Sequence, residues 1–252
     1  MPTKLGNSGN GQESYNPNDG KYMSQGESAF QQQMGISNNG KRKQLPTFRM
    51  PIPGETEAQY FAKFRLNAID SIMKETGYNG EEAAKAYSAF DNYFRGDYSQ
   101  FVNGNMQEET ATIDDALSRM GAYDGTIYRG ISFSGLQGED DEQYYGFLNK
   151  VLSGKPFSLS RSENCLSSWT SDKNVGKSFA NLDIYFKNSI ILVCKNNKSA
   201  VGVEHISGFG EDEGEVLAPS KCKYKFVSHD YRFKQMSTKY RIHVIVVEEV
   251  EW

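Results

Sequence analysis

Apolar side chains recur at intervals of three and four residues through the first half of the chain, which is the spacing of one face of a helix. From Glu55 this face consists of aromatic and aliphatic residues: Tyr60, Phe61, Phe64, Ala68, Ile69 and Ile72. Gly77 predicts the end of this helix. Two further helices are expected over residues 81–94 and 112–120, the last with Thr112 as its N-cap. We expect their aromatic stripes to pack in the core.

The second half of the chain is dominated by alternating polar and apolar residues, the spacing of strands. Strands are expected over residues 126–133, 166–171, 189–194, 214–217, 223–227 and 240–249. Two helices are expected among them, over residues 142–152 and, capped by Asp172, over residues 173–180. Helices first and strands later indicate an α+β fold, with helices packed on a bent, mostly antiparallel sheet.

Residues 1–48 differ in composition from the remainder of the chain. They are rich in Gly, Asn, Gln and Ser and show almost no aliphatic periodicity, so they bury too little apolar surface to offset the entropy of ordering. We interpret them as a disordered tail, which serves either as a recruitment or packaging tag or as a plain flexible extension. Residues 49–252 are expected to form one domain.

The composition excludes several classes of protein. The chain has 252 residues, 24% charged and 37% hydrophobic, as in soluble globular proteins. No apolar run approaches the roughly 18 residues of a membrane helix. The polar start predicts no Sec signal peptide and therefore action in a cytoplasm, reached by phage delivery or another secretion route. Cys165, Cys194 and Cys222 are too irregularly spaced for a zinc site and are expected as reduced thiols.

The charge is unevenly distributed. Six basic and three acidic residues give the first 50 residues a charge of +3. Since the net charge of the chain is −4, the remaining residues carry a charge of −7. Proteins that bind nucleic acid normally carry a basic patch, so an acidic domain makes a nucleic-acid partner unexpected.

An acidic stretch stands at the mouth of the expected strand 214–217. Glu213 and Glu215 are separated by one glycine and lie on one face of an extended chain, and Glu211 precedes them at the same spacing. Neighbouring carboxylates repel one another, and their concentration at a Gly-rich turn indicates a functional site. The alternative is a solvated acidic loop.

Two further segments stand before this one in the chain: Tyr128-Arg129-Gly130 and Ser168-Trp169-Thr170, each on an expected strand. The three segments in this order resemble the Arg-Ser-Glu class of mono-ADP-ribosyltransferases, which includes catalytic subunits of clostridial binary toxins and enzymes encoded by bacteriophages. The resemblance spans roughly residues 55–250. It implies the ADP-ribosyltransferase fold, with N-terminal helices on a bent two-sheet core around an NAD cleft.

The flanking residues fix which members of each segment match the family. Trp169 replaces the usual middle Thr of the second motif, which leaves Ser167 and Ser168 as alternatives; the spacing to Phe179 favours Ser168. In the acidic motif the last Glu of the family runs into an apolar pair, as Glu215 does, so Glu213 and Glu215 are preferred over Glu211.

The resemblance assigns a role to each residue, and the chemistry agrees. Breaking the bond between nicotinamide and ribose leaves an oxocarbenium-like cation, which Glu215 would stabilise while holding the ribose 2′-hydroxyl. Arg129 would bind the pyrophosphate with its fork of donors, and Ser168 would orient Glu215. Glu213 would bind and deprotonate an acceptor arginine.

The remaining site residues are implied by position in the family pattern. Tyr128, Gly130 and Phe179 are expected to bind NAD together with Arg129, Ser168 and Glu215. Tyr185 and Phe186 either lie in a loop over the nicotinamide end or begin the next strand in the core. Phe209 is the aromatic residue of the expected acceptor-recognition turn.

The expected activity is transfer of ADP-ribose from NAD+, as substrate, to an arginine of a target protein, by a monomer without a metal or a membrane association. NAD hydrolysis and transfer to another acceptor, such as a nucleic acid, are alternatives within enzymes. A catalytically inactive binding or virion-associated module is the alternative from another class.

Overall fold

The computed structural model describes residues 54–95, 100–101, 103–133, 139–159, 165–180, 188–207, 214–233 and 241–251. The chain divides into two units, residues 1–39 and 40–252, and every described residue belongs to the second. The predicted tail, residues 1–48, lies outside the described residues.

The observed elements confirm the predicted α+β class. The helices are α2 (Glu57–Thr76), α3 (Gly80–Arg95), α5 (Gln107–Arg119), α6 (Glu139–Leu152), α7 (Lys173–Phe179) and α8 (Glu204–Ser207). The strands are β1 (Ile127–Phe133), β2 (Ser167–Thr170), β3 (Asn188–Cys194), β4 (Val201–Gly202), β5 (Glu215–Ala218), β6 (Lys223–Phe233) and β7 (Arg241–Glu251). Strand β4 and helix α8 were not predicted, because two and four residues are too few to show a period.

Local signals fix both ends of the first helix, of which the end at Gly77 was predicted, whereas the start lies at Glu57 and not at Glu55. Thr56 and Gln59 form a capping box, in which the Thr56 hydroxyl accepts from the Gln59 amide and the Gln59 side chain accepts from the Thr56 amide. Gly77 ends α2 with a φ of 76°, a conformation that favours glycine, and its N–H donates to Met73 at 3.0 Å. The N-cap of α7 is Asp172, whose carboxylate accepts from Asn174.

The start of α5 was predicted wrongly. This helix begins at Gln107, so Thr112 lies inside it and its hydroxyl donates to the Glu108 carbonyl at 2.9 Å instead of capping. Glu108 and Glu109 occupy the first turn, where the helix dipole favours negative charge. Helix α6 likewise begins three residues before its predicted start, at Glu139.

The seven strands form one sheet, in the order β4-β5-β2-β1-β3-β7-β6. Every pairing is antiparallel except that of β3 with β7. The expected two-sheet core is therefore corrected to a single sheet. Its halves join at β1, which pairs with β3 along seven residues but with β2 only where Tyr128 faces Thr170.

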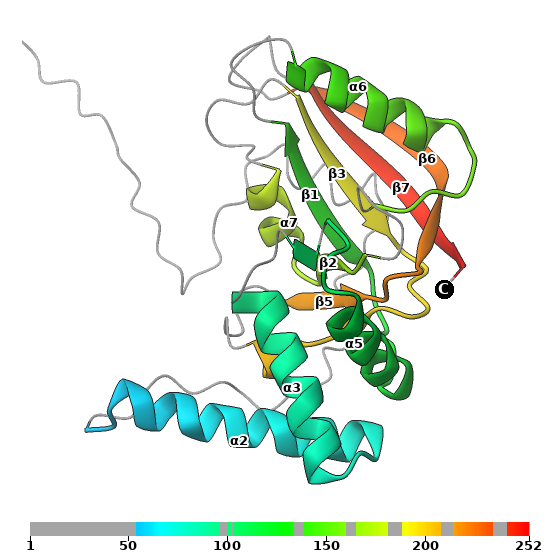
Figure 1. Ribbon diagram of the computed structural model, residues 1–252. Helices are drawn as coiled ribbons and strands as arrows, with labels where there is room; N and C mark the ends of the chain where they lie inside the picture. The colour runs from blue at the N-terminus through cyan, green and yellow to red at the C-terminus, as the bar shows by residue number, and fades with distance from the viewer. Residues whose placement is uncertain are drawn as a thin grey trace, which may run out of the picture. The chain divides into compact units, whose positions relative to one another are not determined.

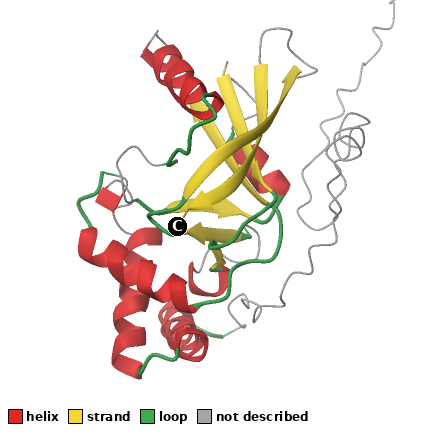
Figure 2. Ribbon diagram, turned by 90° about the vertical axis from the view of Figure 1, so that its right-hand side faces the viewer, coloured by secondary structure: helices red, strands yellow, loops and turns green. Residues whose placement is uncertain are grey.

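Two apolar cores hold the helices to this sheet. Helices α2, α3 and α5 gather near β5 and enclose the first core, here called the helical core, to which Leu217 contributes from the sheet (Figures 1 and 2). The second core, here called the sheet core, lies where α6 packs beside β1, β3, β6 and β7, and it contains Trp169 and Tyr224. The helical core contacts β5 and the sheet core contacts β1, so both reach the strands that carry the motifs.

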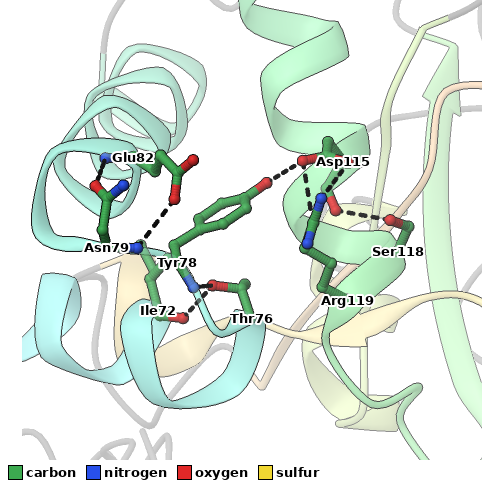
Figure 3. Close-up of polar contacts among 8 residues, drawn as sticks. All are labelled: Ile72, Thr76, Tyr78, Asn79, Glu82, Asp115, Ser118 and Arg119. Carbon is green, nitrogen blue, oxygen red and sulfur yellow. Dashed lines mark hydrogen bonds and ion pairs between the residues drawn. The ribbon is translucent and has the colours of Figure 1, made fainter.

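A polar network ties the turn between α2 and α3 to α5 (Figure 3). The Tyr78 hydroxyl donates to the Asp115 carboxylate, and the Arg119 guanidinium lies 3.2 Å from that carboxylate and over the Tyr78 ring at 5.0 Å. Burial, together with the bond to Asp115, raises the pKa of Tyr78 to about 12. The network fixes α5 against the two helices that precede it.

In the described part of the chain, no helix has the length and apolar character needed to cross a membrane.

Candidate active site

Glu215, Ser168 and Arg129, one residue from each motif, lie on three adjacent strands, β5, β2 and β1. Ser168 pairs with Leu217 and Thr170 pairs with Glu215 across β2 and β5. Residues that are directly opposite share a face, and side chains alternate between faces along each strand, so Ser168 and Glu215 are diagonal neighbours on one face. The topology thus brings together residues that stand 47 positions apart in the chain.

Ser168 contacts both of the other motif residues. Its hydroxyl donates to Oε1 of Glu215 at 3.5 Å, and its backbone carbonyl accepts a hydrogen bond from the Arg129 guanidinium. At 3.5 Å the bond to Glu215 is at the long end of the range for a hydrogen bond.

Ser167 and Trp169 lie on the opposite face of β2, because side chains alternate along a strand. Trp169 packs in the sheet core with its ring centroid 5.0 Å from that of Tyr224, and Ser167 is buried. The Trp that departs from the family motif therefore fills the core instead of the site. Of the two serines, Ser168 is the one whose hydroxyl reaches Glu215.

The Arg129 guanidinium is oriented by a hydrogen bond that uses only part of its N–H donors. One Nη donates to the Ser168 carbonyl, which fixes the plane of the group. Its Nε is buried and has no acceptor among the residues that the structure describes. A guanidinium carries five N–H donors, so this one retains donors for an anionic group.

Glu215 opens strand β5 and is 9% exposed. Its backbone carbonyl accepts from Val203 at 2.9 Å, which fixes the strand at this point. The preceding residue, Gly214, has a φ of 54°, and a Cβ atom there would overlap the Ser171 hydroxyl. The carbonyl of Gly214 also accepts from Ser171 N at 2.7 Å. The glycine between the two glutamates is therefore required by the backbone and by close packing against the end of β2.

Tyr128 and Gly130, on either side of Arg129, pack against helix α7. A Cβ atom on Gly130 would lie within 3.0 Å of the backbone of α7 at Gly176 and Phe179, and of Ala180 just after it. Tyr128 is buried, and burial raises its pKa to about 12, with Tyr123 and Asp172 adding to the effect. These two residues place α7 on β1.

The other predicted site residues have different outcomes. Phe179 ends α7 and is 55% exposed, so its ring is available at the surface. Four others lie outside the described residues, as does the alternative Glu211, and their roles stay predictions: Tyr185, Phe186, Phe209 and Glu213.

Sequence reasoning missed one residue of the candidate site, Tyr93 of α3. Its hydroxyl lies 2.8 Å from the Ser168 hydroxyl, although its ring belongs to the aromatic stripe that was assigned to the core. Helical spacing identifies the buried ring but not the group that its hydroxyl meets.

Within the described ranges, no group of three or more His, Cys, Asp or Glu side chains could hold a metal ion.

Solved structures that are similar to the chain include ADP-ribosyltransferases, the class of enzyme whose motifs the three segments resemble. HopU1 of Pseudomonas syringae pv. tomato DC3000 has 15% identity and a TM-score of 0.49, over 80% of this chain and 100% of its own. BECa, from a binary enterotoxin of C. perfringens, has 19% identity and a TM-score of 0.48, over 78% of this chain and 49% of its own. Vis toxin of Vibrio splendidus has 18% identity and a TM-score of 0.39, over 81% and 89% of the two chains.

No protein-family model matches the sequence, and no curated protein matches it. At identities of 15–19% and TM-scores below 0.5, the activity has to be argued from the residues of the site.

Proposed function

We propose that this protein transfers ADP-ribose from NAD+ to the side chain of an arginine in a target protein and releases nicotinamide. The observation that carries the proposal is the position of Ser168 between the other two motif residues: its carbonyl accepts from Arg129 and its hydroxyl donates to Glu215. Ser168 of β2 thus holds the Arg129 guanidinium and the Glu215 carboxylate at a fixed separation.

Glu215 is suited to stabilise a cation that forms during bond cleavage. When the bond between nicotinamide and C1′ of the ribose breaks, its electron pair leaves with the neutral nicotinamide and positive charge develops on the ribose. A carboxylate that is only 9% exposed acts on that charge through little water, so its effect is stronger than at an open surface. The Ser168 hydroxyl would keep the carboxylate from turning away.

Arg129 is suited to hold the pyrophosphate of NAD+. Its guanidinium is fixed by one bond to the Ser168 carbonyl, and the remaining N–H donors match the oxygens of a phosphate in pairs. An anchored pyrophosphate restricts the ribose to one position relative to Glu215. This reduces the entropy that must be lost on reaching the transition state.

Glu213 would select the acceptor in this proposal, which here rests on the sequence motif. An arginine nitrogen attacks C1′ and forms the new N–C bond, and the proton that it gives up passes to the Glu213 carboxylate. A guanidinium keeps its proton at neutral pH, so a carboxylate that binds it is needed for this step.

Agmatine, a free guanidinium compound, provides a direct test. The purified chain is incubated with NAD+ and agmatine, and nicotinamide and the ADP-ribosylated agmatine are followed by mass spectrometry. We expect both products. Nicotinamide without the adduct would instead indicate a hydrolase or a transferase for another acceptor, and the absence of both products would favour an inactive binding module.

A further inference from the structure

Tyr93 joins the helical core to the candidate site through its hydroxyl. The residue is 2% exposed, and its ring meets those of Phe94 and Phe101 edge to face, each with a centroid distance of 5.3 Å. The hydroxyl lies 2.8 Å from the Ser168 hydroxyl, a shorter contact than the 3.5 Å from Ser168 to Glu215. A phenol that is buried in an apolar core needs a polar partner, and Ser168 is one.

The direction of these two bonds follows from the number of protons. An ionised carboxylate only accepts, so the Ser168 hydroxyl spends its single proton on Glu215. The bond between the two hydroxyls must then be donated by Tyr93. The chain of donors therefore runs from Tyr93 to Ser168 to Glu215, and each bond polarises the next.

We propose that Tyr93 is a positioning residue for the reaction: it holds the Ser168 hydroxyl in the rotamer that points at Glu215. This inference rests on the proposed cleavage of NAD+. A serine hydroxyl turns freely unless its oxygen is held. Without Tyr93 the proton of Ser168 has other directions to take, and Glu215 loses a fixed donor.

Substitution of Tyr93 by Phe separates this role from packing, because it removes one oxygen and keeps the ring in the aromatic core. The matched control is Tyr87→Phe, since Tyr87 is also buried on α3 and has its ring in the same core. Steady-state nicotinamide release is measured against NAD+ concentration, with thermal melting of each variant. We expect Tyr93→Phe to lower kcat about fivefold, the equivalent of one hydrogen bond, with an unchanged KM, and Tyr87→Phe to leave both constants unchanged.

A double-mutant cycle with Ser168→Ala tests the route of the effect. If Tyr93 acts through Ser168, Tyr93→Phe has no further effect on kcat once the serine hydroxyl is gone. The same fold-loss of kcat in both backgrounds would overturn the inference, because it would show that Tyr93 acts independently of Ser168. An unchanged kcat in Tyr93→Phe, or a rise in KM alone, would also overturn it.

A second variant covers the case in which Tyr93→Phe does not fold. Incorporation of 3-fluorotyrosine at position 93 keeps the hydroxyl and makes it a stronger donor. We therefore expect kcat to change in the protein that retains Ser168 and to stay constant in the Ser168→Ala variant. An equal change in both backgrounds overturns the inference. If the unmodified protein releases no nicotinamide, the proposed function fails and this inference fails with it. If nicotinamide is released but the effects of Tyr93→Phe and Ser168→Ala on kcat are additive, only the role of Tyr93 is overturned.

Discussion

The hydroxyl oxygen of Ser168 lies 3.5 Å from Oε1 of Glu215, across the pairing of β2 with β5. The same serine accepts a bond from Arg129 through its backbone carbonyl. One residue on the middle strand thus sets the positions of both a cation and an anion. The next strand position on either side points to the opposite face, so a shift of one residue would break the arrangement.

The two serines of β2 should differ in their importance. We expect Ser168→Ala to lower kcat for nicotinamide release about tenfold or more, because a hydrogen bond to a charged group is lost. Ser167→Ala is the control, since Ser167 lies on the other face, and its kcat should stay within about twofold of the unsubstituted protein. A larger loss of kcat in Ser167→Ala than in Ser168→Ala would mean that the functional hydroxyl has been misassigned.

Glu213 and Glu211 provide a test of the acidic motif. Glu213→Gln should retain NAD+ hydrolysis and lose the agmatine adduct, since the amide no longer accepts the proton of the acceptor. The matched variant Glu211→Gln should retain both products. Mass spectrometry of the two products in each variant decides the matter, and an adduct that survives in Glu213→Gln but not in Glu211→Gln would transfer the role to Glu211.

Gly130 should be intolerant of a side chain. A Cβ atom there would lie 2.8 Å from the backbone carbon of Phe179 and nearer still to other backbone atoms of α7, so Gly130→Ala should push the helix from β1 and lower the free energy of unfolding by about 3 kcal/mol. The control is Gly146→Ala in α6, where nothing lies within 4 Å and the helix gains about 0.5–1 kcal/mol. Urea unfolding measures both. Equal stability of the two variants would contradict the close packing of α7.

The buried thiols predict a loss of stability at alkaline pH. Burial raises the pKa of Cys194 to about 11 and that of Cys222 to about 12, from 9.0. A raised pKa means that the folded protein holds the proton more tightly, so the stabilisation is complete below pH 9 and is lost as the pH rises from there through 11 and 12.

Each thiol should lower the free energy of unfolding by about 1.4 kcal/mol per pH unit inside this window. Urea unfolding at a series of pH values measures the slope, and Cys222→Ala should reduce it while Cys194 still contributes. A slope that stays the same in Cys222→Ala would show that other groups cause the alkaline loss.

Local signals in the sequence predicted most of the fold. The end of α2 at Gly77 and the cap of α7 at Asp172 were predicted because both depend on residues within one turn of the chain. Thr112 misled the prediction, because a threonine can also bond back to a carbonyl inside a helix, here to that of Glu108. Whether the strands form one sheet or two depends on the pairing at Tyr128, which is a long-range contact.

The candidate site was predictable where the family pattern supplied the residues, and not elsewhere. Ser168 and Glu215 were chosen by their flanking residues, and the structure places them in contact. Tyr93 belongs to no motif, and it stands 75 positions before Ser168 in the chain. Periodicity reports that a ring is buried, but the partner of its hydroxyl depends on how α3 packs against β2.

The proposed cleavage of NAD+ is tested by nicotinamide release from the unsubstituted protein and from Glu215→Gln, with a thermal melt of each. Glutamine keeps the volume and the ability to accept from Ser168 but cannot carry the negative charge that stabilises the ribosyl cation. We expect release by the unsubstituted protein and a loss of at least about a hundredfold in the folded variant. Release at equal rates by both proteins would contradict this expectation.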